Sequence, residues 1–177
     1  NQRLIGADSS PAMKNLKEIL SEISLKEFTL NKSYRSTVEI MEYANRYLKE
    51  EKIVPLVRNG NPVKELTIDD EEALGSAVEN IITEYKEKGL ENIAIIAPTL
   101  SEVKEAEKVI KEKYYLTVID REEFIYQGGV VMLPSYFAKG LEFDGVIVLN
   151  KLSSPSYDHI KYIMCTRALH ELTEISY

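Results

Sequence analysis

The stretch VVMLPSYFAKGLEFDGVIVLN, residues 130–150, decides the fold that this sequence predicts. Its two ends, residues 130–133 and 146–149, are short runs of β-branched and apolar residues. Such runs, when turn residues bound them, are typical of strands buried on both faces, as in parallel sheets. Between them lies a polar elbow, residues 138–144, which holds a cation, a glycine and two carboxylates. We expect the elbow to lie at an end of the sheet, where open α/β sheets bind ligands.

The rest of the chain alternates predicted strands with predicted helices. Strand-like runs occupy residues 63–68, 93–97, 115–119 and 172–175. Apolar residues at helical spacing indicate helices over residues 71–88, after a cap at Thr99 or Ser101, and over residues 157–169. Strands that alternate with helices of about ten or more residues indicate βαβ units and a parallel sheet. The sequence therefore predicts an α/β fold.

An earlier helix is predicted to begin at Ser36, because Ser36 and Glu39 have the spacing of a capping box. Tyr34 and Arg35 come just before it, where the free N–H groups of a helix start favour an anion. An aromatic ring beside a fixed cation suits a nucleotide, because the ring stacks on a base and the cation reaches a phosphate. A surface Tyr–Arg pair at a helix cap remains the alternative.

Arg167 lies in the last predicted helix, where it shares one stripe with Ile160, Ile163 and Met164. That stripe is apolar, so the pattern directs a guanidinium group toward the protein interior. An unpaired buried cation is costly, and Arg167 therefore needs a carboxylate, a cluster of carbonyls or a bound anion. A structural salt bridge to a neighbouring Glu or Asp and a ligand role both remain open.

Composition limits the function further. A net charge of −7 argues against a surface that holds nucleic acid through bulk electrostatics. The single Cys165 and the two histidines exclude an internal disulfide and argue against a structural zinc site, and they favour a reducing, cytoplasmic setting. No apolar segment approaches the roughly 18 residues that a membrane span needs, so we expect no membrane contact.

The chain is predicted to divide into a lead-in, residues 1–27, and one domain, residues 28–177. The lead-in carries apolar residues at helical spacing after Pro11. Because the chain begins at Asn1 without a methionine, we expect it to be part of a longer protein.

Three stretches, taken in order, resemble a known family. Residues 32–37 (KSYRST) with Ala44-Asn45, residues 138–144 (AKGLEFD) and residues 162–168 (YIMCTRA) are similar to motifs IV, V and VI of UvrD/Rep-type superfamily 1 DNA helicases. Residues 133–136 (LPSY) look closer to the HelD-like branch, the helicase-like ATPases that act on bacterial RNA polymerase.

This resemblance implies a RecA-like domain of the P-loop NTPase type, the second of two (domain 2A), with a mostly parallel sheet and helices on both faces. ATP would bind between the two domains. By position, Tyr34 would stack on the adenine, Arg35 would reach the γ-phosphate and Glu142 would bind the ribose. Gly140 would let the backbone come close, and Arg167 would be the arginine finger.

The resemblance also implies weaker assignments. Gln2 corresponds to the motif III glutamine, which senses the γ-phosphate. Ser135, Tyr136 and Lys139 are candidates for contact with single-stranded DNA, since Tyr136 offers a ring for stacking, although Lys139 also fits a solvated lysine. The family has Thr-x-His where this chain has Pro134-Ser135-Tyr136, which puts DNA unwinding in doubt.

The sequence contains no G-x-x-x-x-G-K-S/T motif and no convincing acidic Walker B strand. We therefore expect that the chain does not hydrolyse ATP alone, and that the N-terminal RecA-like domain of the same protein holds Mg²⁺. The predicted function is the C-terminal half of an ATP-dependent helicase. The alternatives are a HelD-like motor that remodels RNA polymerase and a non-catalytic module that binds protein or nucleic acid. A dinucleotide enzyme is set aside, since no G-x-G-x-x-G follows a strand.

Overall fold

The computed structural model of the chain describes residues 15, 18–20, 32–48, 52–55, 58–70, 72–121, 126, 128–153 and 158–177. In these ranges the helices are α2 (Val38–Ala44), the 3₁₀ turn η1 (Asn45–Tyr47), α3 (Ala73–Glu87), α4 (Leu100–Ile110) and α5 (Asp158–Cys165). The strands are β1 (Lys32–Ser33), β2 (Val54–Pro55), β3 (Lys64–Thr67), β4 (Asn92–Ala97), β5 (Thr117–Val118), β6 (Gly129–Pro134), β7 (Phe143–Asn150) and β8 (Ala168–Ser176).

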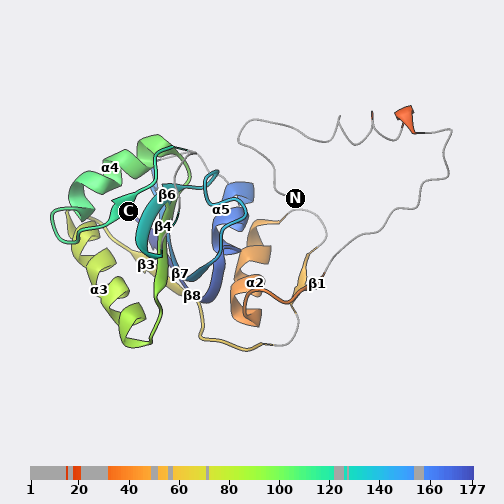
Figure 1. Cartoon of the computed structure of the whole chain (residues 1–177), viewed down its shortest axis with the longest axis horizontal. Helices are drawn as coiled ribbons and strands as arrows, with labels where there is room; N and C mark the ends of the chain where they lie inside the picture. Colours follow the sequence, from red (N-terminus) through yellow and green to blue (C-terminus); the bar gives the residue numbers. More distant parts are fainter. Residues whose placement is uncertain are drawn as a thin grey trace.

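Six of these strands form one sheet in the order β3-β8-β7-β4-β6-β5, and every pairing in it is parallel. The two decisive runs of the sequence, β6 and β7, lie on either side of β4 at the centre of the sheet. Figure 1 shows the sheet between two pairs of helices. The predicted α/β class with a parallel sheet is confirmed.

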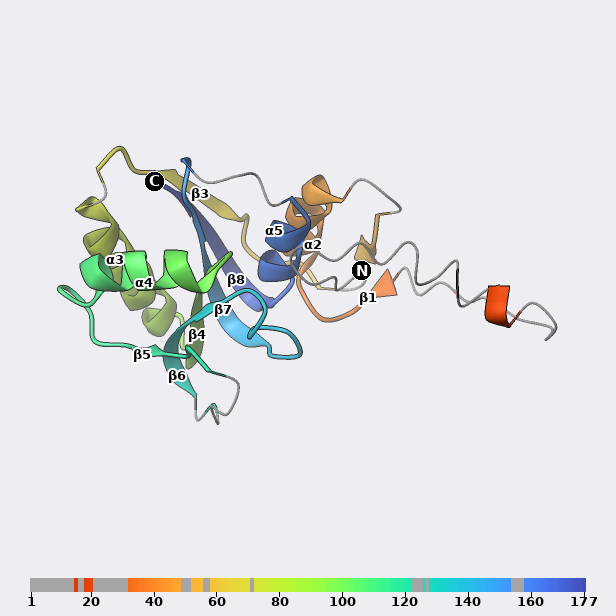
Figure 2. The ribbon, with the colours of Figure 1, turned by 90° about the horizontal axis from the view of Figure 1, so that it is seen from above.

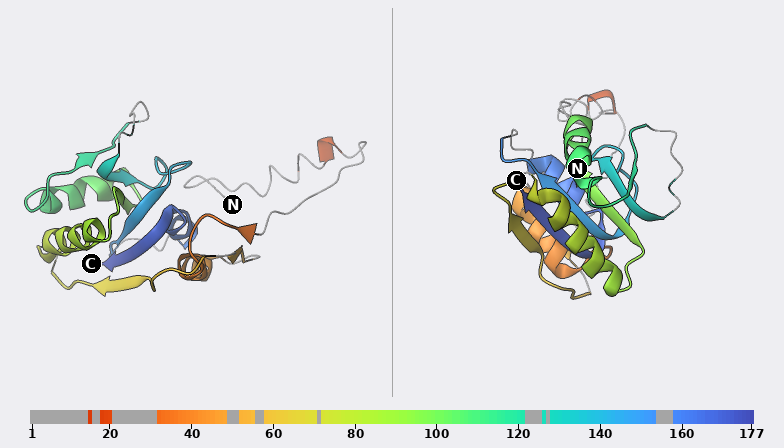
Figure 3. Two further views of the ribbon diagram at one scale, coloured as in Figure 1. Left: turned by 60° about the horizontal axis from the view of Figure 1, so that its bottom comes forward. Right: turned by 90° about the vertical axis from the view of Figure 1, so that its left-hand side faces the viewer.

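Each central strand is buried on both faces, and its side chains alternate between two cores. On β4, Ala94 and Ile96 join the core beneath α2 and α5, whereas Ile93 and Ile95 join the core beneath α3 and α4. This period of two is what a pleated strand dictates. Figures 2 and 3 show the pair α3 and α4 on one side of the sheet and the pair α2 and α5 on the other. None of the helices in the described ranges is long and apolar enough for a membrane crossing.

The predicted cap of the first helix is wrong by one residue. The N-cap of α2 is Thr37, whose side chain accepts a hydrogen bond from the N–H of Ile40 at 3.4 Å. Ser36 instead donates its hydroxyl to the carbonyl of Ala168 at 2.7 Å, and Glu39 accepts from the N–H of Gly60 at 2.7 Å. Both side chains of the predicted capping box are thus used in long-range contacts. The second predicted cap is confirmed, since Thr99 forms a full capping box with Glu102.

The last helix is shorter than predicted. Helix α5 ends at Cys165, and β8 begins at Ala168, so Arg167 lies in the turn between them and not on the helix. The pairing of β8 with β7, which starts at Ala168 opposite Phe143, accounts for the early end. The predicted strand over residues 115–119 is reduced to the two residues of β5, and most of the predicted lead-in, with Pro11, lies outside the described residues.

In the structure the elbow comprises residues 135–142, because Phe143 and Asp144 belong to β7, and it crosses the sheet from one end to the other. Ser135 follows β6 and donates its N–H to Ala97 at the end of β4, whereas Phe143 opens β7 at the opposite end. Because β6 and β7 are both parallel to β4, residues 135–142 must travel back along the length of that strand. Ala138, fully buried, anchors this return path in the core beneath α2 and α5. Glu142 therefore lies at the amino end of the strands, not at the carboxyl end where open sheets usually bind ligands.

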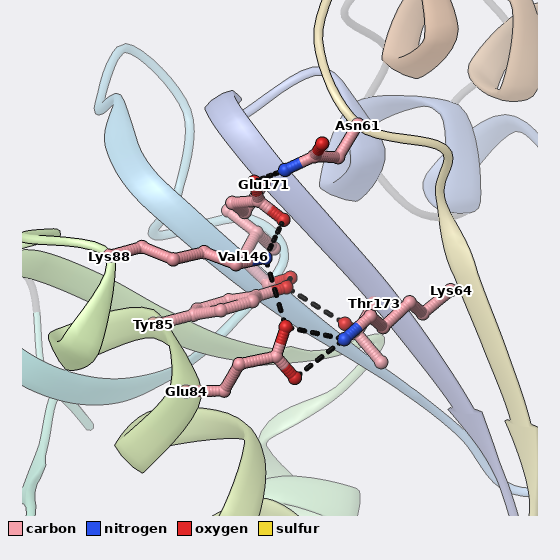
Figure 4. A network of polar contacts seen from close by, with 8 residues as sticks. All are labelled: Asn61, Lys64, Glu84, Tyr85, Lys88, Val146, Glu171 and Thr173. Carbon is pink, nitrogen blue, oxygen red and sulfur yellow. Dashed lines mark hydrogen bonds and ion pairs between the residues drawn. The ribbon is translucent and has the colours of Figure 1, made fainter.

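A network of charges fastens α3 to the edge of the sheet (Figure 4). Lys88 lies between two carboxylates, with its Nζ 2.9 Å from Glu84 and 3.0 Å from Glu171. Lys64 of the edge strand β3 makes an ion pair of 2.5 Å with Glu84, and Asn61 donates to Glu171. The two lysines, Lys64 first and then Lys88, lower the pKa of Glu84 below its usual value of 4.5.

This shift predicts acid sensitivity. A carboxylate with a lowered folded-state pKa stabilises the protein above its unfolded pKa, and this contribution disappears as pH falls through the folded value. We expect Glu84→Gln to lower the free energy of unfolding at pH 7 and to make no difference once pH is well below 4.5. Urea unfolding between pH 3 and 7 measures this. Glu87→Gln on the same helix is the control, since Glu87 is exposed. An equal pH response of both variants would contradict the assignment.

Candidate functional site

Three charged side chains, Arg35, Glu142 and Arg167, come together at the amino end of the sheet. Arg35 precedes α2, and the hydroxyl of Ser36 holds this segment against the first residue of β8, Ala168. Glu142 ends the elbow, and the next residue, Phe143, donates its N–H to the carbonyl of Arg167 at 3.0 Å. Two hydrogen bonds to backbone carbonyls therefore bring three distant parts of the sequence to one place.

Glu174 of β8 holds the helix that follows Arg35. Its carboxylate, 5% exposed, accepts hydrogen bonds from the hydroxyls of Tyr43 and Tyr47, each at 2.9 Å, and from Nζ of Lys161 at 3.1 Å. Burial and this negative charge raise the pKa of both tyrosines. Helix α2 and the turn η1 are thus fixed to the strand that begins next to Arg167.

Arg35 and Glu142 form the accessible part of the site. Their Nε and Oε1 atoms lie 2.5 Å apart, and the side chains are 50% and 36% exposed. An ion pair with this exposure contributes little to stability, because water screens it. Both groups are therefore available to a ligand at little cost in folding.

Arg167 forms the buried part of the site, with only 3% of its surface exposed. It donates from Nε to the carbonyl of Ile163 at 3.2 Å, from Nη1 to the carbonyl of Leu141 at 3.4 Å, and from Nη2 to the hydroxyl of Thr166 at 3.3 Å. All three acceptors are neutral. Among the described residues no carboxylate makes an ion pair with Arg167, so the salt bridge considered from the sequence is not found there.

The pKa of Arg167 reflects this setting. Burial lowers it first and the nearby charge of Arg35 lowers it further, while Glu142 and Tyr162 act in the opposite direction. The site thus holds two neighbouring guanidinium groups, those of Arg35 and Arg167, and the partly exposed carboxylate of Glu142. Such an arrangement gains stability when a further anion neutralises the second cation.

Three further predicted residues lie close in sequence to the site. Tyr34 adjoins Arg35, and Gly140 and Lys139 come two and three residues before Glu142. Tyr34 is 71% exposed beside Arg35, so its ring is free for stacking. Gly140 has φ +84°, a left-handed conformation that explains the glycine, and a Cβ there would meet no atom within 4 Å. Lys139 is exposed on the elbow. Gln2 lies outside the described residues.

Ser135 and Tyr136 lie at the other end of the elbow, away from the three charged residues. The Ser135 hydroxyl is buried and donates to the carbonyl of Pro98 at 2.7 Å. Tyr136 is 36% exposed and packs edge-on against Phe137, with ring centroids 4.6 Å apart. Their contact with nucleic acid stays a prediction, and Tyr136 is the better placed of the two.

Sequence reasoning assigned no role to Arg58. Its Nη2 donates to the carbonyl of Arg35 at 3.3 Å and to the carbonyl of Leu169 at 2.5 Å. No local pattern could have indicated this contact, because both acceptors are backbone atoms far away in the sequence. The described residues hold no group of three His, Cys, Asp or Glu side chains that could bind a metal ion.

The fold is that of a helicase RecA-like domain. The chain is similar to the crystal structure of the C-terminal domain of a possible DNA helicase from Lactobacillus plantarum WCFS1. The sequence identity is 30%, the match covers 81% of this chain and 87% of that one, and the TM-score is 0.69. The chain therefore belongs to the family of helicase C-terminal domains, and the predicted RecA-like class is confirmed.

A second solved structure, an arterivirus nonstructural protein 10 (helicase) in complex with DNA, is matched with 5% identity and a TM-score of 0.46. That match covers 78% of this chain and 30% of the viral one. It is too distant to support an argument. No protein-family model matches the chain, and no curated protein matches it.

Proposed function

We propose that the chain forms one wall of the ATP site of a longer superfamily 1 helicase or translocase. One observation carries the proposal: a buried arginine, Arg167, lies beside a second arginine and has only neutral hydrogen-bond acceptors. Burial of such a cation without a carboxylate is costly. A ligand with several negative charges offsets that cost, and a nucleotide triphosphate is such a ligand.

The residues then have distinct roles. Arg35, which is half-exposed, binds the terminal phosphate, and Tyr34 stacks on the base. Glu142 accepts a hydrogen bond from the ribose, and the backbone at Gly140 approaches the nucleotide. ATP supplies the phosphoryl group that is transferred to water. Gln2, by its position in the sequence, senses the γ-phosphate, and the N-terminal RecA-like domain holds the phosphates and Mg²⁺.

Arg167 acts as the arginine finger in this proposal, which requires its side chain to change conformation. The guanidinium faces inward, so it must turn away from Leu141 and Thr166 before it reaches a phosphate. Hydrogen bonds from a charged donor to neutral acceptors contribute about 1.5–3 kcal/mol each. Bonds to a γ-phosphate replace them, because a phosphate oxygen carries a full negative charge and accepts two parallel N–H bonds from one guanidinium, which neutral carbonyl and hydroxyl acceptors do not.

The elbow supports a link between nucleotide and nucleic acid. Its first part carries the exposed ring of Tyr136, and its last part carries Glu142, the partner of Arg35. A base stacked on Tyr136 would therefore act on the same eight-residue segment, residues 135–142, that borders the ATP site. Single-stranded DNA is the proposed partner on this side.

A HelD-like motor on RNA polymerase is the second candidate. It is favoured by the buried hydroxyl of Ser135, whose bond to Pro98 leaves it unavailable to DNA. A motor that works on a protein partner has no need of that contact.

The test is steady-state ATP turnover by the intact protein that carries this chain. We expect turnover that increases when the working partner is added. Stimulation by single-stranded DNA supports the helicase, and stimulation by RNA polymerase alone supports the HelD-like motor. The absence of both ATP binding and turnover in the intact, folded protein would contradict the proposed function.

A further inference from the structure

The segment Arg58–Gly60 wraps around the start of α2. The carbonyl of Arg58 accepts the N–H of Val38 at 2.9 Å, and the N–H of Gly60 donates to Glu39 at 2.7 Å. Gly60 lies so close to Thr37 that a Cβ at this position would come within 2.5 Å of the threonine side chain. The segment therefore lies in close contact with the start of the helix, and glycine permits this close approach.

The side chain of Arg58 extends this contact to the functional site. One nitrogen, Nη2, donates to the carbonyls of both Arg35 and Leu169. The first belongs to the residue that pairs with Glu142, and the second lies two residues after Arg167. A single guanidinium therefore joins the backbones that carry the two arginines of the site.

We propose that Arg58 is a positioning residue, which fixes the backbone of Arg35 relative to the turn that carries Arg167. This inference rests on the proposed function and adds to it a residue that touches neither nucleotide nor phosphate.

The physical reason lies in the position of Arg35 in the chain. Arg35 comes before the N-cap Thr37, so no helical hydrogen bond restrains it. Its N–H donates to the hydroxyl of Ser33 at 3.5 Å, and the hydroxyl of the next residue, Ser36, holds the segment to Ala168. The carbonyl of Arg35 accepts from Arg58, which also binds Leu169. Without Arg58 the carbonyl of Arg35 loses its described side-chain partner, and the ion pair between Arg35 and Glu142 becomes one conformer among several. Catalysis by oriented charge depends on such geometry, and misplacement by about 1 Å costs up to about 10²-fold in rate.

The first test needs no nucleotide. The side-chain Nε–H of Arg35 is the donor in the ion pair with Glu142, so its NMR signal reports directly on that contact. We expect Arg58→Ala to shift and broaden this signal in the 177-residue chain, and Arg58→Lys to retain part of it, since an ammonium group still reaches backbone carbonyls. Arg121→Ala is the control, because Arg121 is an exposed arginine of another loop. An unchanged Arg35 signal in folded Arg58→Ala would overturn the inference.

The second test is a double-mutant cycle on ATP turnover by the intact protein. We expect Arg58→Ala to lower kcat by about 10-fold to 10²-fold with a smaller change in KM. In an Arg35→Ala background the same substitution should change kcat less than about 2-fold, because Arg58 acts through Arg35. A purely structural role would lower the melting temperature and leave kcat per folded molecule unchanged.

The outcomes separate the two proposals. If the wild-type protein turns over ATP and Arg58→Ala matches it in both rate and NMR signal, the positioning role is wrong and the proposed function stands. If the NMR signal changes as expected but the wild-type protein neither binds nor hydrolyses ATP, the proposed function is wrong and the positioning role toward it falls with it.

Discussion

Arg167→Ala in the intact protein is expected to lower kcat for ATP hydrolysis by about 10³-fold or more, with folding intact. The guanidinium has three neutral acceptors and no ion pair among the described residues, so its removal breaks no salt bridge. In the proposed mechanism it stabilises the charge that develops on the transferred phosphoryl group. That interaction is stronger in the transition state than with bound ATP, so kcat falls by a larger factor than the affinity for nucleotide.

Two further variants make this test specific. Arg167→Lys keeps the charge but loses the planar fork, and it should regain only a small part of the rate. Thr166→Val removes one of the acceptors that hold the side chain inward, and it should lower kcat far less than Arg167→Ala does. Turnover and circular dichroism measured on the same samples separate chemistry from folding. Normal turnover by a folded Arg167→Ala protein would make Arg167 a structural residue and remove the arginine finger from the mechanism.

The sheet could be predicted because its signal is local. Each buried strand is a short apolar run, and each helix between strands has its own apolar stripe, so β4, β6, β7 and α3 lie where the sequence indicated. Thr99 and Glu102 likewise form their capping box from residues three positions apart. These features depend on neighbours in the sequence alone.

The errors occur where distant residues compete for the same group. Ser36 and Glu39 have capping-box spacing, but their side chains make other hydrogen bonds. Ser36 donates to the carbonyl of Ala168, and Glu39 accepts from the N–H of Gly60. Arg167 was expected on a helix, but pairing between β7 and β8 ends the helix at Cys165. Its burial was nevertheless predicted correctly, because the turn still directs the side chain back toward the carbonyl of Ile163.

Assembly of the site could be predicted only in part. The resemblance to helicase motifs brought Tyr34, Arg35, Glu142 and Arg167 into one hypothesis, and three of these four charged or aromatic groups now lie together. The return path of the elbow to the amino end of the sheet has no local signal. Neither has the contact of Arg58 with two backbone carbonyls.

Phe143→Ala is expected to give the largest loss of stability, about 3–5 kcal/mol. The ring is fully buried in the core beneath α2 and α5, and it packs edge-on against Tyr126 with centroids 5.4 Å apart. Alanine at this position leaves a cavity that the surrounding strands fill only in part. For a domain of this size the melting temperature should fall by about 10 °C.

The position of Phe143 gives this prediction a meaning beyond stability. Phe143 belongs to the motif AKGLEFD, but the resemblance to helicases gives it no role. In the structure its N–H donates to the carbonyl of Arg167, and its buried ring fixes the end of the elbow that carries Glu142. Phe143→Leu should lose about 1–2 kcal/mol and keep this backbone contact. Phe137→Ala, on the same elbow but only partly buried, is the matched control and should lose less than Phe143→Ala. Urea unfolding of the three variants measures the differences.

A loss below about 1 kcal/mol for Phe143→Ala would mean that the core closes over the cavity. The elbow would then be fixed by its hydrogen bonds, and the hydrophobic anchor would have no part in holding Glu142 beside Arg35.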